Sequence, residues 1–175
     1  MNNSLRKVAI VGPECTGKSE LAMFLAKHYN TQWVPEYARN YLDNLVRPYN
    51  ENDLIVIAHG QKRLEEEYVR DANGFLFIDT TLLVIKIWSE FKYGRCDPTI
   101  IQSLESSSYD LHLLTYIDIP WEADPQREHP DKRAELYQIY LAQIKAMKVP
   151  FAEIRGERQE RRTTAIQAIE SLKTK

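Results

Sequence analysis

Residues Gly12 to Ser19 (GPECTGKS) match the pattern G-x-x-x-x-G-K-[ST] at every fixed position. Glycines let the backbone turn tightly, so that successive N–H groups can face inward around phosphate oxygens. A helix that begins after Gly17 would add the positive end of its dipole. Lys18 can neutralise charge between the β- and γ-phosphates, and the Ser19 hydroxyl can ligate Mg²⁺. The residues expected to bind a nucleoside triphosphate are Gly12, Pro13, Glu14, Cys15, Thr16, Gly17, Lys18 and Ser19.

The sequence on either side of this stretch supports a phosphate-binding loop. Lys7 to Val11 (KVAIV) is a short apolar run rich in β-branched residues, which is typical of a strand buried on both faces. Gly17 to Tyr29 carries apolar residues at helical spacing. A chance match in an ordinary turn is the alternative. The strand–loop–helix context favours the functional interpretation, because this pattern binds phosphate in that context.

Beyond the loop, short apolar runs alternate with segments of helical periodicity. Asn50 and Asp53 have the spacing of an N-cap and its third-position acid, which predicts the start of a long helix. The alternation predicts an α/β fold: a P-loop NTPase kinase-like three-layer sandwich with a mainly parallel five-stranded sheet, in one domain over residues 1–175. The expected strands are Lys7–Val11, Gln32–Val34, Phe75–Asp79, Leu111–Ile117 and Phe151–Ile154. The expected helices are Gly17–Tyr29, Asn50–Arg70, Leu82–Phe91, Ala134–Met147 and Thr164–Leu172.

The overall composition excludes several classes of protein. Of 175 residues, 43% are apolar and 27% charged, which fits a folded domain rather than a disordered chain. No stretch approaches the roughly 20 apolar residues of a membrane span, and a formal net charge of −2 lacks the basic excess of a nucleic-acid binder. Cys15 and Cys96 match no disulfide or metal spacing, and the first residues lack the apolar core of a signal peptide. We expect a soluble cytoplasmic protein that binds neither nucleic acid nor membranes.

A second candidate for the metal site is Asp79, at the end of the apolar run Phe75–Asp79 (FLFID). The carboxyl ends of parallel strands converge on the ligand crevice, where a carboxylate can hold Mg²⁺ or its water ligands. An aspartate at this place can also simply end a strand. With the phosphate-binding loop present, we expect Asp79 and Ser19 to share a Mg²⁺ site.

The acceptor side is expected after the second strand, in an insertion over residues 35–70 that begins with Glu36, Tyr37 and Arg39. A carboxylate there can accept the proton of a substrate hydroxyl if it lies within hydrogen-bond reach. An exposed helix start with an acid in its first turn is the alternative. Glu36 is therefore the candidate base.

Residues 121–133, here named the lid segment, are polar and interrupted by two prolines. The segment carries Arg127 and Arg133 just before a helix, and arginines on a closing loop can stabilise charge on a transferred phosphoryl group and exclude water. A solvated surface loop is the alternative. Arg127 is the stronger candidate of the two. The expected catalytic residues are Lys18, Glu36, Asp79 and Arg127.

A P-loop by itself does not name an activity. A GTPase should carry an N-K-x-D guanine motif after a late strand, and this sequence has none. A hexameric ATPase, a motor or a helicase needs more residues than remain beyond the core. A small kinase needs only a core, an acceptor-binding insertion and a lid, and this class is favoured.

Several stretches together resemble the ribosylnicotinamide kinase domain of the NadR family, most of all its free-standing single-domain members. The P-loop alone is generic, whereas the combination is fairly specific. The similarity extends over about residues 6–172. The stretches are GPECTGKS, EYARNY (36–41), IAHGQ (57–61), FIDT (77–80) and PWEADPQRE (120–128).

The resemblance implies a reaction: ATP and Mg²⁺ are used to phosphorylate the 5′-hydroxyl of nicotinamide riboside, giving nicotinamide mononucleotide for NAD salvage. It places Glu36, Tyr37 and Arg39 in the riboside pocket, and Asp124 and Arg127 in the lid. The family pattern often reads D-T-D where this chain reads DTT (79–81). Because Thr81 stands in place of the second acid, a ribose or metal contact from that position is not carried over to this chain. Full-length NadR proteins also carry adenylyltransferase and DNA-binding domains, which we do not expect in 175 residues.

A pyridinium riboside has a flat cationic ring, which aromatic faces hold by stacking and cation–π attraction. Tyr93 is the first candidate, because it follows the helix after Asp79, and Trp33 lies close to Glu36 in the sequence. Ordinary core packing is the alternative for each aromatic residue. The expected substrate-binding residues are Glu36, Tyr37, Arg39, Trp88, Tyr93, Trp121 and Asp124. On the nucleotide side, Gly156, Arg158 and Thr163 are expected to join the loop.

Two other functions remain open from the sequence. Another small-molecule P-loop kinase, acting on a different nucleoside or on a nucleotide, would share these features because pocket shape sets substrate choice. A nucleotide-sensing ATPase module without a small acceptor would lack an enclosed pocket beside Glu36. The expected partner is a small molecule, and the oligomeric state is left open.

Overall fold

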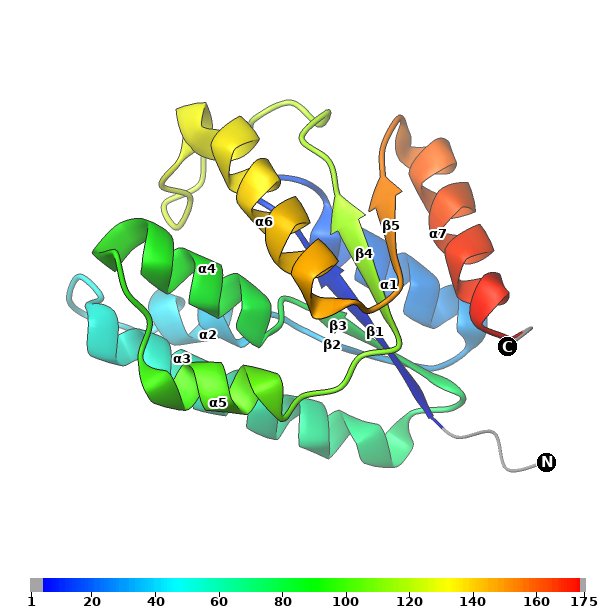
Figure 1. Ribbon diagram of the computed structural model, residues 1–175, viewed down its shortest axis with the longest axis horizontal. Helices are drawn as coiled ribbons and strands as arrows, with labels where there is room; N and C mark the ends of the chain where they lie inside the picture. The colour runs from blue at the N-terminus through cyan, green and yellow to red at the C-terminus, as the bar shows by residue number, and fades with distance from the viewer. Residues whose placement is uncertain (1–4, 174–175) are drawn as a thin grey trace.

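The computed structural model describes residues 5–173 and contains a five-stranded sheet (Figure 1). Its order is β2-β3-β1-β4-β5, and each neighbouring pair is parallel. The α/β fold with a parallel five-stranded sheet, expected from the alternation of elements, is confirmed. The strands are β1 (Arg6–Val11), β2 (Gln32–Val34), β3 (Phe75–Asp79), β4 (Leu111–Thr115) and β5 (Phe151–Ile154).

Helices follow the strands and return the chain to the amino edge of the sheet. The α-helices are α1 (Lys18–Tyr29), α2 (Tyr37–Asp43), α3 (Glu51–Tyr68), α4 (Leu82–Tyr93), α5 (Pro98–Glu105), α6 (Arg133–Met147) and α7 (Arg158–Lys173). Two short 3-10 helices are η1 (Val69–Asp71) and η2 (Pro130–Lys132).

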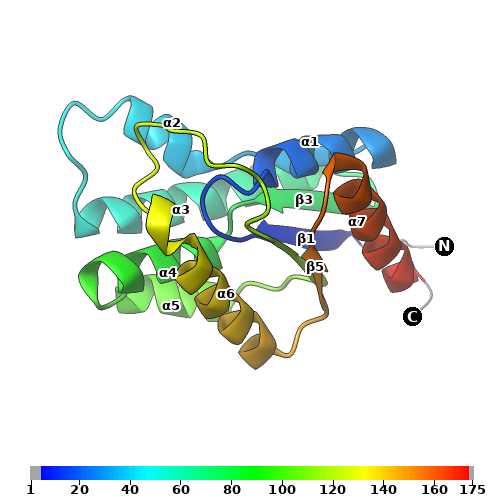
Figure 2. The ribbon, with the colours of Figure 1, turned by 90° about the horizontal axis from the view of Figure 1, so that it is seen from above.

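The central strand β1 serves both apolar layers of the sandwich. Val8 and Ile10 pack in the cluster formed with α1 and α7, whereas Ala9 and Val11 pack in the cluster formed with α3, α4, α5 and α6. Successive side chains of a strand point to opposite faces, so an apolar residue is needed at each of these positions. Figures 1 and 2 show the two groups of helices on opposite sides of the sheet. The predicted three-layer sandwich is confirmed.

Two element boundaries differ most from the sequence-based expectation, and two helices were not expected. Helix α7 begins at Arg158 rather than Thr164, because polar side chains and not an apolar stripe hold its first turn. Strand β4 ends at Thr115 rather than Ile117, since the next two residues pack at the margin of the core. Helices α2 and α5 were not predicted. Asp97 caps α5 by accepting the Thr99 N–H at 2.8 Å.

The predicted cap of α3 is present: the Asn50 side chain accepts the Asn52 N–H, and the Asp53 carboxylate accepts the Asn50 N–H at 2.7 Å. Within residues 5–173, no helix combines the length and apolar character that crossing a bilayer requires.

Candidate active site

The phosphate-binding loop joins β1 to α1 and depends on two glycines. Gly12 has φ 143°, and a Cβ there would lie 2.5 Å from Thr115 Oγ1 and 2.8 Å from the Thr115 carbonyl oxygen. Gly17 has φ 74° at the N-cap of α1. L side chains rarely adopt such angles. The local backbone therefore requires glycine at both fixed positions, and it places the N-terminus of α1 at the loop.

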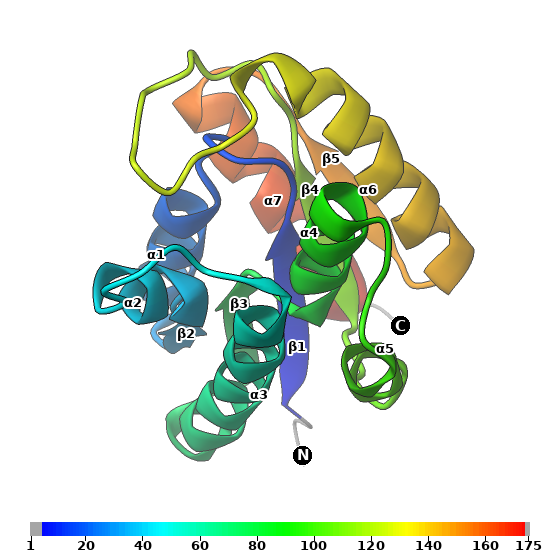
Figure 3. The same cartoon turned by 90° about the vertical axis from the view of Figure 1, so that its left-hand side faces the viewer.

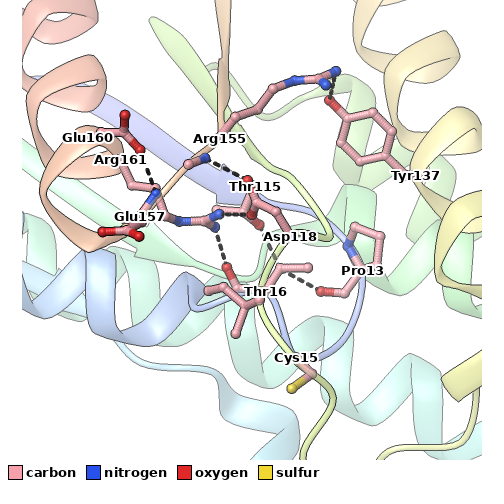
Figure 4. Close-up of polar contacts among 12 residues, drawn as sticks. Pro13, Cys15, Thr16, Thr115, Asp118, Tyr137, Arg155, Glu157, Glu160 and Arg161 are labelled. Atoms are coloured by element: carbon pink, nitrogen blue, oxygen red, sulfur yellow. Dashed lines mark hydrogen bonds and ion pairs between the residues drawn. The ribbon is translucent and has the colours of Figure 1, made fainter.

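Hydrogen bonds hold the loop against the end of β4. Thr16 Oγ1 donates to the Pro13 carbonyl over 2.7 Å and lies 2.7 Å from Thr115 Oγ1. Thr115 Oγ1 in turn donates to the Val11 carbonyl at 3.1 Å. Figure 4 shows the two threonines between the loop and the sheet. Lys18 Nζ donates to the Pro13 carbonyl at 2.9 Å. The loop conformation is thus fixed by contacts within the protein.

A cavity of about 280 Å³ lies beside the loop and brings residues from distant parts of the chain together. Loop residues form one wall, and α2, α4, α6 and the lid segment form the rest. The lining residues are Gly12, Pro13, Glu14, Cys15, Thr16, Gly17, Lys18, Ser19, Glu20, Glu36, Ala38, Arg39, Leu42, Val84, Ile87, Trp88, Phe91, Gln126, Arg127, His129, Leu136 and Tyr140.

Glu36 is the N-cap residue of α2 and lines this cavity together with the loop. Burial raises the pKa of the Glu36 carboxyl, while the nearby Lys18 and Arg39 act in the opposite direction. Lys18 belongs to the loop, so the carboxylate and the phosphate-binding cation interact electrostatically. A partly buried carboxylate with a raised pKa next to a phosphate site has the properties of a general base.

Asp79 ends β3 beside β1, opposite Ile10 in the register. Asp79 is 1% exposed, and its Oδ1 atom has no hydrogen-bond partner among the residues that the structure describes. Burial raises the pKa of Asp79, whereas Lys18 and the Ser19 hydroxyl lower it. Mg²⁺ takes one or two protein oxygens together with phosphate oxygens and water. A free carboxylate oxygen near the Ser19 hydroxyl fits that requirement.

The lid segment bridges the phosphate-binding loop and α2, and Figure 3 shows it passing beside the loop. The Glu14 carboxylate of the loop accepts the backbone N–H of Glu128 at 3.0 Å and of His129 at 3.2 Å. Arg39 of α2 donates from Nη1 to both oxygens of Asp124, at 2.9 and 2.8 Å. The Gln126 N–H and this guanidinium hold the pKa of Asp124 below its usual range. The lid segment therefore closes over the cavity by polar contacts.

Both lid arginines reach Cys15 of the loop. Arg127 Nη1 lies 3.3 Å from Cys15 Sγ, and Arg127 lines the cavity. Arg133 is 8% exposed, and its Nη2 donates to the Cys15 carbonyl at 3.3 Å. The two guanidinium groups lie 6.0 and 5.8 Å from the centre of the Trp121 ring. Arg127 is the one of this pair placed to contact a ligand, whereas Arg133 anchors the lid.

The side of the cavity formed by α4 is apolar and aromatic. One stripe of α4 supplies Val84, Ile87, Trp88 and Phe91, spaced at i, i+3, i+4 and i+7. The Trp88 Nε1–H donates to the Tyr49 hydroxyl at 2.9 Å, which fixes the orientation of the indole. An oriented aromatic surface of this kind can hold a flat ring.

Four of the residues expected to bind substrate are not among the residues that line the cavity. The Tyr37 ring packs on α3, where a Cβ at Gly60 would lie only 2.2 Å from it. Tyr93 is partly buried at the margin of the core. Trp121 contacts the lid arginines, and Asp124 pairs with Arg39. Of the aromatic candidates, Trp88 lines the cavity, and Trp33 packs in the cluster with α1 and α7.

Three residues expected on the nucleotide side lie around the start of α7, outside the lining of the cavity. The Gly156 N–H donates to Asp118 Oδ2 at 2.5 Å, Arg158 pairs with Glu20 at 3.1 Å, and Thr163 is exposed. The partners of Gly156 and Arg158 are therefore Asp118 and Glu20, which lie far from them in the sequence.

The structure also brings in residues that the sequence analysis did not single out. These are Gln126 and His129 of the lid segment, Leu136 and Tyr140 of α6, and the α4 residues Val84, Ile87 and Phe91 beside the predicted Trp88. The helical spacing of the α4 stripe is a signal that could have been recognised. Gln126 and His129 carried no such signal, because a loop has no periodicity that indicates which of its side chains point toward a cavity.

A loop of this geometry, on a parallel sheet with strand order 2-3-1-4-5 and beneath an arginine-bearing lid, defines the class of P-loop phosphotransferases. Residues 7–161 match the family described as an AAA domain, and the chain belongs to that family. Family and fold set neither an acceptor nor an oligomeric state.

Known proteins similar to this chain refine that class. The sequence is 29% identical over 161 residues to the trifunctional NAD biosynthesis/regulator protein NadR of Escherichia coli (strain K12), covering 87% of this chain and 39% of the relative. The chain thus spans less than half the length of that curated relative. The expected resemblance to NadR proteins is confirmed.

Solved structures share the fold at low identity. A crystal structure of NadR protein in complex with NR has a TM-score of 0.75 at 21% identity, covering 95% of this chain and 51% of that one. Thymidylate kinase from Candida albicans has a TM-score of 0.70 at 16% identity, covering 96% and 92%. The predicted P-loop kinase fold is confirmed.

Proposed function

We propose that this protein is a kinase that transfers the γ-phosphoryl group of ATP to the 5′-hydroxyl of nicotinamide riboside, giving ADP and nicotinamide mononucleotide. One observation carries the proposal: the phosphate-binding loop and the partly buried Glu36 carboxylate line the same cavity, whose α4 side is apolar and aromatic. The similarity to NadR proteins supports the choice of acceptor.

In the proposed reaction, the acceptor hydroxyl oxygen forms a bond to the γ-phosphorus while the bond to the β,γ-bridging oxygen breaks. Glu36 takes the proton of the hydroxyl, and ADP leaves with the electrons of the broken bond. Lys18 and Arg127 stabilise negative charge around the transferred group. Ser19 and Asp79 would hold Mg²⁺, which neutralises phosphate charge when bound.

The lid segment contributes by enclosing the reactants. Glu14 and Arg39 each hold it over the cavity, from the loop and from α2 respectively. A closed lid excludes water, which would otherwise accept the phosphoryl group in place of the substrate. Closure also brings the guanidinium of Arg127 into the lining of the cavity.

The acceptor ring is assigned to the α4 side of the cavity. Trp88 and Phe91 present aromatic surface there, and a pyridinium ring is both flat and cationic. Cation–π attraction favours such a ring over a neutral base of similar size. A different nucleoside or nucleotide acceptor is the second candidate, and the fold shared with thymidylate kinase favours it.

The deciding experiment measures ADP release with ATP and Mg²⁺ across a panel of nucleosides that includes nicotinamide riboside, thymidine and deoxyadenosine. We expect nicotinamide riboside to give the highest kcat/KM, and Lys18→Ala to abolish the signal. If another nucleoside releases ADP and nicotinamide riboside does not exceed buffer, the acceptor assignment is wrong. If ATP is hydrolysed slowly whatever nucleoside is added, the protein is a nucleotide-sensing module.

A further inference from the structure

Arg161 on α7 is a buried charge that the proposed reaction leaves without a role. The residue is 5% exposed. Its Nη2 donates to the Thr16 carbonyl oxygen at 2.6 Å, and its Nη1 pairs with Asp118 Oδ1 at 2.5 Å (Figure 4). Burying an arginine is unfavourable unless its charge and donors are satisfied. The Arg161 guanidinium is therefore held in one orientation, behind the phosphate-binding loop.

Asp118 extends the contact to a third segment. Its second oxygen accepts the Gly156 N–H at 2.5 Å. Asp118 follows β4, and Gly156 lies between β5 and α7. Arg161 and Asp118 thus connect the phosphate-binding loop with two other loops at the carboxyl edge of the sheet.

The Thr16 carbonyl belongs to the peptide group that also contains the Gly17 N–H. A peptide group is planar and trans, so its C=O and its N–H point in opposite directions. Arg161 draws the Thr16 oxygen toward α7, and the Gly17 N–H must therefore point away from α7. Gly17 lines the cavity, and glycine adopts its φ of 74° without strain, so the loop can hold this peptide orientation.

We propose that Arg161 is a positioning residue of the nucleotide site: it orients the Thr16–Gly17 peptide so that the Gly17 N–H faces the bound phosphate chain. Asp118 holds the guanidinium in place for this task. The inference rests on the proposed function only in requiring that the loop binds a polyphosphate, and it is independent of the acceptor.

The test compares Arg161→Lys with the wild type by calorimetric titration of ATP, inorganic tripolyphosphate and adenosine. Lysine keeps the positive charge, but its single ammonium cannot keep the guanidinium geometry toward Asp118 and the Thr16 carbonyl. Loss of one oriented N–H to a charged phosphate should raise the Kd of ATP and tripolyphosphate about 10-fold or more. The affinity for adenosine should stay within about 2-fold, because the Gly17 peptide contacts phosphate and not the nucleoside.

Ala165→Gly is the matched control, because Ala165 is fully buried one turn further along α7 and makes no polar side-chain contact. Glycine loosens the helix and lowers the Tm, and tripolyphosphate binding should stay unchanged. The inference is overturned if Arg161→Lys binds tripolyphosphate like the wild type. It is also overturned if adenosine affinity falls as much as ATP affinity, or if Ala165→Gly shows the same loss. A wild-type protein that binds no ATP would instead contradict the proposed function.

Discussion

The two walls of the cavity are built in different ways. The phosphate wall is one continuous stretch, Gly12–Glu20, shaped by backbone angles and by threonine contacts behind it. The acceptor wall is assembled from side chains of α2, α4, α6 and the lid segment, which lie more than 100 residues apart at the extremes. The lid part of that wall is held by partly exposed polar pairs such as Arg39–Asp124, with side chains 41% and 23% exposed.

This difference implies different tolerances to change. A site made from main-chain groups needs a particular backbone conformation, and few residue types allow it. A site made from side chains can change its ligand through single substitutions while the fold is kept. A segment held by exposed pairs also opens at low free-energy cost. Substitutions at a few positions should therefore strongly weaken phosphate binding, whereas substitutions at many positions should each change acceptor binding by a smaller amount.

The largest effect is expected from Lys18→Ala, on the phosphate wall. Removal of the cation proposed to stabilise the transferred phosphoryl group should lower kcat/KM about 10³-fold or more, with the acceptor affinity little changed. Steady-state ADP release and acceptor titration give the two values. A loss of less than about 10-fold would contradict the role of Lys18 and remove the contrast between the walls.

Glu36→Gln should give the next largest effect, on the acceptor wall. The amide keeps the shape but cannot accept the hydroxyl proton, so kcat should fall about 10²-fold or more, while the Kd of ATP stays near the wild-type value. Arg63→Gln, which removes an exposed ion pair with Glu67 on α3, is the control and should leave kcat unchanged. An unchanged kcat in Glu36→Gln would exclude this residue as the base.

The pH dependence of kcat should carry the signature of Glu36. Burial raises the pKa of its carboxyl above the ordinary value, and the base acts only when it is deprotonated. Activity should therefore fall about 10-fold per pH unit below that raised pKa and should recover as the pH rises above it. A rate profile for wild type and Glu36→Gln separates this limb from others. A limb that persists in the variant would assign it to another group.

Trp88→Ala should raise the acceptor KM about 10-fold and leave the ATP KM unchanged, because Trp88 lines the α4 side of the cavity, where we propose that the acceptor ring binds. Tyr93→Leu offers a comparison on the same helix, since Tyr93 lies outside the cavity lining. Equal effects of the two substitutions would show that the α4 stripe supports the fold rather than the ligand.

The smallest effect is expected from Asp124→Asn, which weakens the ion pair between lid and α2. Partly exposed ion pairs contribute about 0.2–1 kcal/mol, so the acceptor KM should change about 2- to 5-fold, and less at high salt. Lys132→Gln breaks an exposed ion pair between the lid segment and Glu135 of α6, and it should have no effect on the acceptor KM. A large change in kcat would mean that Asp124 acts on the chemistry directly.

Much of the fold could be predicted because it depends on local patterns. The apolar runs FLFID and KVAIV gave their strands, and the Asn50–Asp53 capping box gave the start of α3. The start of α7 was placed too late, because Arg161 is buried by partners from distant loops and not by an apolar stripe. The same cause keeps the Tyr37 ring out of the cavity lining: its neighbour Gly60 lies 23 positions further along the chain.

The sequence alone determined the phosphate-binding loop, since glycines at fixed places, a lysine and a serine are sufficient to define a main-chain cradle at a helix N-terminus. It also determined the alternating α/β order, because apolar periodicity reports which face of each element is buried. Only the tertiary structure decided which side chains line the acceptor wall, that Glu14 and Arg39 hold the lid, and that Arg161 stands behind the loop. Those contacts join residues far apart in the chain, and local periodicity carries no information about which distant partner a polar side chain will meet.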